Sequence, residues 1–104
     1  MKKNKVIYLS APISGYDLDE RRAMFQRKED ELVKRGYTVL NPMKNGLDAS
    51  EPTTHHMKRD IVMLLQADAI LLLTNWNRSA GCLTELHVAT AIGLEVLFDD
   101  IYTI

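Results

Sequence analysis

Glu85 is the acidic residue whose place in the sequence is hardest to explain by packing. Within the helical pattern of residues 80–92 it falls on the apolar side, together with Cys82, Leu86, Ala89 and Ile92. A buried carboxylate is costly, so it persists either because it is paired structurally or because its reactivity is used. Its place near the start of a helix that follows an apolar strand favours a ligand crevice.

Asp60 is a second acid close to an apolar stripe. Residues from Thr53 or Thr54 to Gln66 predict a helix that turns Met57, Ile61, Leu64 and Leu65 inward, with Asp60 at the margin of that stripe. Alone, Asp60 could cap the helix or pair with Lys58 or Arg59. If it reaches the same crevice as Glu85, two carboxyls with separated pKa values could divide nucleophilic and acid–base work.

Two short segments could hold a phosphate. The loop after the first strand offers hydroxyls, a flexible glycine and backbone N–H groups ahead of a helix, and its candidate ligand contacts are Ser10, Pro12, Ser14 and Gly15. It matches neither common glycine-rich phosphate-binding pattern. The second segment runs from Ser79 to Gly81 at a predicted helix start, where Ser79 is also a natural N-cap.

Two aromatic residues are candidates for contact with a planar base. Trp76 stands in a polar loop, which favours it, while Tyr8 lies in a predicted strand. Three histidines and Cys82 show no metal-ligand spacing, so neither a metal nor an organic cofactor is expected. The pair His55 and His56 is predicted to face solvent, and Cys82 to be a small core residue rather than a reactive thiol.

Composition sets limits on the partners. The 104 residues carry a formal net charge of -1 and are 46% hydrophobic, which predicts one globular domain over residues 1–104 and no bulk attraction to nucleic acid or to an anionic membrane. The longest apolar runs, residues 61–65 and 69–73, are too short to cross a bilayer. Lys2 and Lys3 before an apolar run imitate a signal peptide, but Ser10 and Pro12 interrupt that run. A cytoplasmic protein is therefore expected.

Strands and helices alternate along the chain. Strands are predicted at residues 6–9, 37–40, 69–73 and 96–98, and helices at 17–35, 53–66 and 80–92, with Asp17 as an N-cap and Gly36 as the C-terminal stop of the first helix. This order predicts an α/β three-layer sandwich with a four- or five-stranded, mainly parallel sheet, flavodoxin-like or Rossmann-like. Ligands of such sheets bind beyond the carboxyl ends of the strands, here at residues 10–15, 41–42 and 74–81.

Four segments together resemble a known superfamily: IYLSAPISG at 7–15, GYTVLNP at 36–42, MKRDIVMLLQADAILLL at 57–73 and NWNRSAGCLTELHVA at 75–89. Their order and spacing are similar to those of the nucleoside 2-deoxyribosyltransferase superfamily. The likeness is to its small bacterial and phage branch and, at further remove, to the 2'-deoxynucleoside 5'-monophosphate N-hydrolases. It implies cleavage or transfer of an N-glycosidic bond in a small nucleoside or nucleotide.

The resemblance also implies roles for individual residues. Glu85 matches the family's nucleophilic glutamate, Asp60 the acid that assists the departing base, and Tyr8 the tyrosine that helps to hold the glutamate. Asp68 matches an Ala-Asp pair that does not carry the reaction. Ser79 falls where the nucleotide hydrolases have a serine for phosphate, which favours a 5'-phosphorylated substrate with Ser14 and Gly15 as further phosphate contacts.

The resemblance further implies a homodimer or higher homo-oligomer. The chain ends at Ile104, earlier than typical enzymes of the family, before the later strand and helix through which a neighbouring subunit completes the site. Two alternatives therefore stay open beside an enzyme. One is a non-catalytic nucleotide-binding or sensing domain of the same fold, and the other is a structural interaction module.

Overall fold

The computed structural model describes residues 5–99, so Lys2, Lys3 and Ile104 lie outside the described residues. The elements are β1 (Val6–Ser10), α1 (Leu18–Lys34), β2 (Thr38–Leu40), α2 (Thr53–Leu64), β3 (Ala69–Leu72), α3 (Ala80–Ala91) and β4 (Glu95–Phe98), with short 3-10 turns η1 (Pro42–Lys44) and η2 (Trp76–Arg78). The predicted alternation of strands and helices is confirmed. Within residues 5–99, no helix is long and apolar enough to cross a membrane.

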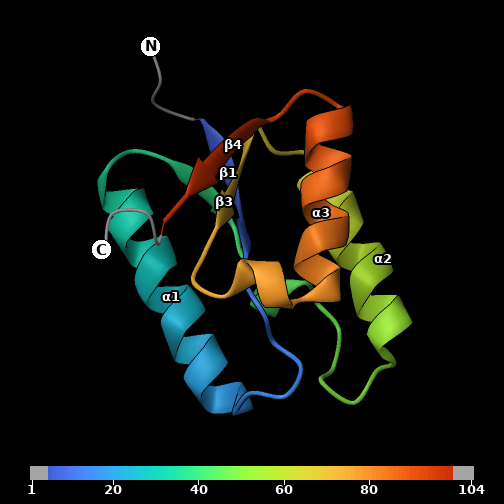
Figure 1. Cartoon of the computed structure of the whole chain (residues 1–104). Helices are drawn as coiled ribbons and strands as arrows, with labels where there is room; N and C mark the ends of the chain where they lie inside the picture. Colours follow the sequence, from blue (N-terminus) through green and yellow to red (C-terminus); the bar gives the residue numbers. More distant parts are fainter. Residues whose placement is uncertain (1–4, 100–104) are drawn as a thin grey trace.

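The strands form one parallel sheet in the order β2-β1-β3-β4. Helix α1 covers one face of this sheet, and α2 and α3 cover the other (Figure 1). The structure therefore confirms the predicted α/β three-layer architecture, with four strands in the described part of the chain. The order of the strands reverses between β1 and β3, and this is the point at which ligands of such folds bind.

Local sequence signals fix the two ends of α1. The Asp17 side chain caps its N-terminus by accepting a hydrogen bond from the Glu20 N–H at 2.9 Å. At the other end Gly36 has φ +96°, a conformation that favours glycine and stops the helix. Both predicted signals are confirmed, and they set the two ends of the helix that lies between β1 and β2.

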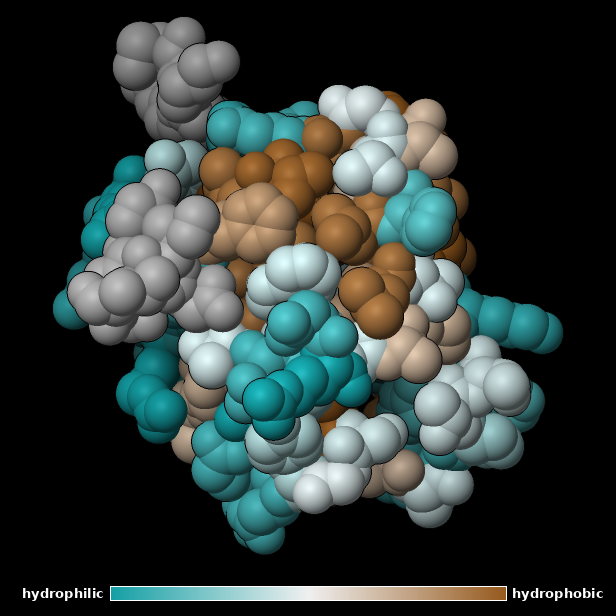
Figure 2. Space-filling model, in the orientation of Figure 1, coloured by the Kyte–Doolittle hydropathy of each residue, from teal (hydrophilic) through white to brown (hydrophobic). Residues whose placement is uncertain are grey.

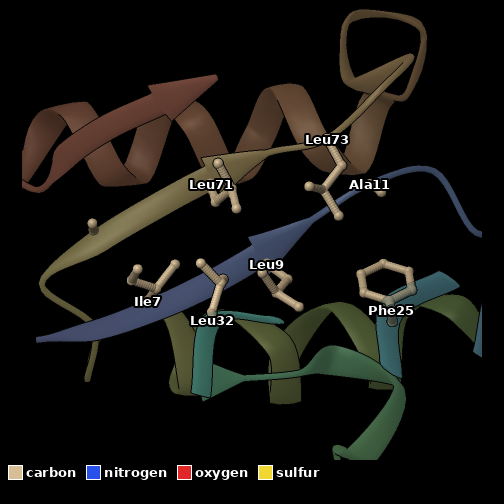
Figure 3. Packing of buried hydrophobic residues seen from close by; sticks show 8 residues of the cluster. Ile7, Leu9, Ala11, Phe25, Leu32, Leu71 and Leu73 are labelled. Atoms are coloured by element: carbon tan, nitrogen blue, oxygen red, sulfur yellow. The ribbon is translucent and has the colours of Figure 1, made fainter. Parts of the chain in front are cut away.

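The face of the sheet under α1 is apolar. Alternate residues of β1 and β3 point to it and pack against two buried side chains of α1; the labelled members are Ile7, Leu9, Ala11, Phe25, Leu32, Leu71 and Leu73 (Figure 3). Phe25 is fully buried there. This cluster anchors α1 to the sheet.

The opposite face packs under α2 and α3, around Tyr8, Ile70 and Leu72. The prediction that Leu65 and Ile92 are buried is wrong, because their exposed fractions are 54% and 48%. Helix α2 ends at Leu64 and α3 at Ala91, so both residues fall in the turns that leave the helices. Apolar atoms gather over β4 and the neighbouring side of α3, whereas polar atoms gather around η2 (Figure 2).

Asp68 ties the sheet together at the amino end of its strands. Its side chain accepts a hydrogen bond from the Val6 N–H at 2.8 Å, and its carbonyl accepts one from the Glu95 N–H at 3.1 Å. The carboxylate thus replaces a strand partner at the start of β1. It lies at the opposite end of the sheet from the residues that follow β1 and β3.

Candidate functional site

A cleft of about 550 Å³ opens at the carboxyl ends of the strands. It is lined by the loop after β1, the segment after β2, one side of α2 and the first turns of α3, where the polar and charged residues include Ser14, Arg22, Asn45, His56, Asp60, Arg78, Ser79 and Glu85. Its volume falls in the range of pockets that bind small molecules. The cleft therefore occupies the expected ligand position of the fold.

Glu85 projects from α3 into the wall of this cleft and is only 6% exposed. The Tyr8 hydroxyl donates a hydrogen bond to its Oε2 at 2.8 Å, and the Ser10 hydroxyl donates one to its Oε1 at 2.7 Å. Both donors come from β1, at alternate positions that face α3. Two hydroxyl groups thus hold the carboxylate in place, and both stabilise its ionised form.

The ion pairs within residues 5–99 do not include Glu85. Burial away from water raises the pKa of Glu85 to about 7; the hydrogen bonds from Ser10 and Tyr8 oppose this rise, and the negative charge of Asp60 adds to it. Burial also raises the pKa of the Tyr8 hydroxyl well above its usual range. Tyr8 therefore remains a hydrogen-bond donor, while Glu85 changes its charge near neutral pH.

Asp60 reaches the same cleft from α2 and is 9% exposed. Its partner is the Asn45 side chain, whose amide Nδ2 donates to Oδ1 at 2.8 Å. Burial raises the pKa of Asp60, and the Asn45 hydrogen bond acts in the opposite direction, as would a positive charge on His56. Arg59 does not pair with Asp60: its guanidinium donates to the Asn45 carbonyl at 2.9 Å.

The two acids therefore come from different helices and line one cleft. They are close enough for the charge of Asp60 to contribute to the raised pKa of Glu85. Burial is nevertheless the main cause of the raised pKa of each acid. Such a pair can supply an ionised nucleophile together with a proton donor.

The other residues singled out in the sequence occupy different places. Pro12, Ser14, Ser79 and Gly81 line the cleft, whereas Ser10 lies behind it as a donor to Glu85. Ser79 caps α3, since its hydroxyl accepts from the Cys82 N–H at 3.2 Å. Gly81 is tightly packed, because a Cβ there would lie 3.2 Å from Met57 Cε.

Gly15 and Trp76 are not among the residues that line the cleft. Gly15 is exposed and adopts φ +86°, so it forms the turn that leads into α1. Trp76 packs against Phe98, with ring centroids 5.5 Å apart and planes tilted by 49°. The indole of Trp76, which the sequence suggested as a contact for a base, thus packs against the apolar cluster beneath α3.

Sequence reasoning missed seven polar residues of the cleft: Tyr16, Arg22, Asn45, Glu51, Thr53, His56 and Arg78. The prediction that both histidines of the tandem face solvent is wrong for His56, which is half-buried. Asn45 is 8% exposed although it lies in a loop of turn-forming residues. Helical spacing from Asp60 back to His56 was the one signal that could have indicated His56.

Cys82 is buried in the wall of the cleft, 2% exposed. Burial raises the pKa of its thiol, which is the reverse of what a nucleophilic cysteine needs. The residues that the structure describes include no group of three or more His, Cys, Asp or Glu side chains that could hold a metal ion. The buried acids that line the cleft are Glu85 and Asp60.

Residues 5–98 match the family model described as "Domain of unknown function (DUF4406)". The chain belongs to the DUF4406 family. A search among curated proteins finds no match. The family assignment thus covers every element of the described fold and leaves the activity open.

Among solved structures, this DUF4406 chain is similar to the 2-desoxiribosyltransferase from Leishmania mexicana. The TM-score is 0.71 and the sequence identity 20%, over 90% of this chain and 63% of that chain. The chain thus spans less than two thirds of the length of that enzyme. The likeness shows a shared fold and confirms the resemblance to the deoxyribosyltransferase superfamily at that level.

Proposed function

We propose that this DUF4406 domain cleaves or transfers the N-glycosidic bond of a small nucleotide, preferably a deoxynucleotide. Glu85 is the nucleophile, Asp60 assists the departing base, and Tyr8 holds the nucleophile. The proposal extends the shared fold to the reaction of a deoxyribosyltransferase. Its substrate is a small molecule, not a nucleic-acid polymer.

The observation that carries the proposal is the arrangement around Glu85. This carboxylate is buried, held by the hydroxyls of Tyr8 and Ser10, free of any ion pair within residues 5–99, and lies in the same cleft as Asp60. A structural ion pair would have supplied a lysine or arginine to offset the cost of burial. Two hydroxyl donors instead orient the carboxylate and leave it reactive.

The proposed reaction has two steps. In the first, an oxygen of Glu85 attacks C1' of the sugar, the bond from C1' to the base nitrogen breaks, and the base leaves with that electron pair and a proton from Asp60. In the second, water or another base attacks C1', its proton passes to Asp60, and the ester to Glu85 breaks. The negative charge near C1' stabilises the oxocarbenium-like transition states of both steps.

The protonation states follow from this scheme. The reacting form has Glu85 ionised and the proton of the pair on Asp60. Base release should therefore fall at low pH, where Glu85 with its pKa of about 7 is protonated, and again at high pH, where Asp60 has lost its proton. The hydroxyl donors favour this form because they stabilise the ionised Glu85.

The positive groups at the cleft favour a substrate with a 5'-phosphate. Ser14 and Ser79 line the cleft, as do the two arginines Arg22 and Arg78 and one exposed acid, Glu51. Backbone N–H groups at the start of α3 add to the attraction for an anion. We assign the phosphate to the two serines and two arginines, with Gly15 shaping the turn beside Ser14.

The test is base release from each deoxynucleoside 5'-monophosphate, with the nucleoside as comparison, followed by chromatography of the free base. Glu85→Gln should lower the rate by a factor of about 10⁴, as expected for loss of a nucleophile. The matched control is Asp30→Asn, an exposed acid of α1 that accepts a hydrogen bond from Gln26, and it should keep the full rate. Undiminished base release by Glu85→Gln would refute the assignment.

A nucleotide-binding domain without turnover is the second candidate. The observation in its favour is the pKa of Glu85, about 7, which leaves part of the carboxyl protonated at neutral pH. A thermal-shift series over nucleosides and nucleotides separates the two candidates, because any ligand that binds only the folded state raises the melting temperature. Stabilisation by a nucleotide without base release at any pH would favour the binding domain.

We also propose that the active form is a homo-oligomer. Strand β4 is an edge of the described sheet, and its residues Val96, Leu97 and Phe98 are only half-buried. Covering such an edge protects it from unwanted pairing. Light scattering of the purified chain should give a mass of at least two chains, and a monomer would contradict the proposal.

A further inference from the structure

The side-chain amide of Asn45 has three hydrogen-bond contacts, and one of them is with Asp60. Its Oδ1 accepts from the Leu47 N–H at 3.0 Å, and its Nδ2 lies 2.8 Å from Asp60 Oδ1 and 3.1 Å from His56 Nδ1. The side chain is 8% exposed. One buried amide therefore connects the loop after β2 to two residues of α2.

These contacts determine the orientation of the amide and the tautomer of the histidine. The Leu47 N–H can only donate, so the atom facing it must be the Asn45 oxygen, and the NH₂ group faces Asp60 and His56. His56 Nδ1 must then be an acceptor without a proton. Its Nε2 carries the proton and donates to the Asp48 carbonyl at 3.1 Å.

The backbone around Asn45 is fixed as well. The guanidinium of Arg59 donates to the Asn45 carbonyl at 2.9 Å. Gly46 follows with φ +88°, and a Cβ at that position would lie 3.3 Å from Arg59 Nη1. The turn therefore depends on glycine and presents the Asn45 amide in one orientation.

The two oxygens of Asp60 differ in their surroundings. Oδ1 accepts from Asn45, whereas Oδ2 has no hydrogen-bond partner among residues 5–99. The same residues contain no fully buried side-chain oxygen that lacks a partner, so Oδ2 is accessible, and Asp60 lines the cleft. Because the amide occupies Oδ1 as a donor, a proton on the carboxyl is carried by Oδ2.

We propose that Asn45 is a positioning residue for Asp60, whose amide, fixed by Leu47 and by neutral His56, holds Oδ1 and directs the protonated Oδ2 towards the leaving base. This inference rests on the proposed function for the role of Asp60. It adds a residue and a tautomer to the proposed site. When the proton leaves Oδ2, the hydrogen bond from Asn45 stabilises the carboxylate that remains.

Protonation of His56 would disturb this arrangement. A proton on Nδ1 would face the NH₂ group of Asn45, placing two donors against each other. The other titratable groups around Asp60 and Glu85 are Tyr8 on β1, Cys82 on α3 and the two acids themselves. The titration of Asp60 is therefore best measured in a Glu85→Gln background, in which the coupled partner does not ionise.

The test is a carbon-detected NMR titration of Asp60 in that background. Asn45→Leu removes the donor with little change in size, and the midpoint of Asp60 should rise by about one to two pH units, as expected for loss of a hydrogen bond to a charged group. His56→Phe removes the acceptor that orients the amide, together with the contact to the Asp48 carbonyl, and should raise the midpoint by about half a unit. An unchanged midpoint in folded Asn45→Leu would overturn the inference.

The matched control is His55→Phe. His55 is the neighbouring histidine and contacts Glu51 at 2.9 Å rather than Asn45, so this variant should leave the Asp60 midpoint unchanged. If Asn45→Leu does not fold, the pair of histidine variants decides the question. Equal midpoints in His55→Phe and His56→Phe would then refute the role of the amide.

Enzyme kinetics distinguish this inference from the proposed function. In the chain with Glu85 intact, Asn45→Leu should lower kcat by at least about tenfold and change KM little, since the acid is misplaced but the cleft remains. Absence of base release by the unmodified chain would refute the proposed function and leave the titration result intact. If the unmodified chain releases base but the Asp60 midpoint is unshifted in Asn45→Leu, only the role of Asn45 is refuted.

Discussion

The two faces of β1 have different roles: one packs apolar side chains and the other holds Glu85. Ile7 and Leu9 point to the α1 side and join a cluster of apolar side chains, whereas Tyr8 and Ser10 point to the α3 side and donate hydrogen bonds to Glu85. Successive residues of a strand face opposite sides of the sheet, so a single strand can serve both purposes. One side of the sheet thus contributes stability, and the other spends part of it to bury a reactive carboxylate.

The comparison shows why the polar side can be tolerated. Every buried hydroxyl or carboxylate around Glu85 has a partner within the described residues, and the apolar cluster beneath α2 and α3 continues past them through Ile70 and Leu72. Unfavourable burial is therefore confined to the carboxyl end of the strands. Removal of a large apolar side chain on the α1 side should lower stability without altering the acids.

Phe25→Ala is the largest expected effect on stability. Phe25 is fully buried in the apolar cluster under α1, and its loss should lower the free energy of unfolding by about 3–5 kcal/mol in urea denaturation. The titration of Glu85 should stay near its original midpoint of about 7, because its partners lie on the other face. The two faces are then separable by one substitution.

The control for this variant is Val33→Ala, on the same helix but 52% exposed. It should change the free energy of unfolding by less than about 1 kcal/mol, as for a surface substitution. A Glu85 midpoint that moves by a full pH unit in folded Phe25→Ala would contradict the separation. The sheet would then couple its two faces more tightly than alternate side chains imply.

Much of this arrangement could be predicted from the sequence, because it depends on periodic patterns. The range of α1, its Asp17 cap and its Gly36 stop could all be predicted, and helical spacing alone placed Glu85 on a buried face. Alternation of strands and helices gave the parallel sheet. The likeness to deoxyribosyltransferases then supplied the pairing of Tyr8 with Glu85, which no local pattern contains.

The remaining features depend on tertiary contacts between segments without periodicity. Asn45 lies in a loop whose residues predict only turns, so its contact with Asp60 required the three-dimensional path of that loop. Trp76 was assigned to a ligand because its neighbours in sequence are polar, but its neighbour in space is Phe98. Leu65 and Ile92 fit the helical spacing of buried residues, but each lies one residue beyond the end of its helix.

Glu85→Gln should make the polar face more stable above neutral pH. The pKa of Glu85 is raised from 4.5 to about 7 by folding, so between these values the folded chain binds more protons than the unfolded chain and stability falls as the pH rises. Above pH 7 the variant avoids a cost of up to about 3 kcal/mol. Urea denaturation at pH 8 and at pH 4 should show this gain at pH 8 only.

Asp30→Asn is the control for this pH dependence. Asp30 is an exposed acid on the α1 side, so its replacement should give the same small change at both pH values. If Glu85→Gln were less stable than the unmodified chain at pH 8, the carboxylate would be a stabilising structural group. That result would contradict the difference between the two faces.

Tyr8→Phe is the smallest of these effects and addresses the polar face most directly. The substitution removes the hydroxyl that donates to Glu85 Oε2 and leaves the Ser10 donor to Oε1. Because that hydrogen bond favours the ionised carboxylate, the pKa of Glu85 should rise above about 7, by about one pH unit. A pH profile of base release should show its acidic limb displaced to higher pH, and an NMR titration of Glu85 should show the same displacement without substrate.

Tyr37→Phe is the matched control, since Tyr37 packs on the α1 side, and it should leave both curves unchanged. A limb that stays in place or moves to lower pH in Tyr8→Phe would show that the hydroxyl does not hold the carboxylate in its ionised form.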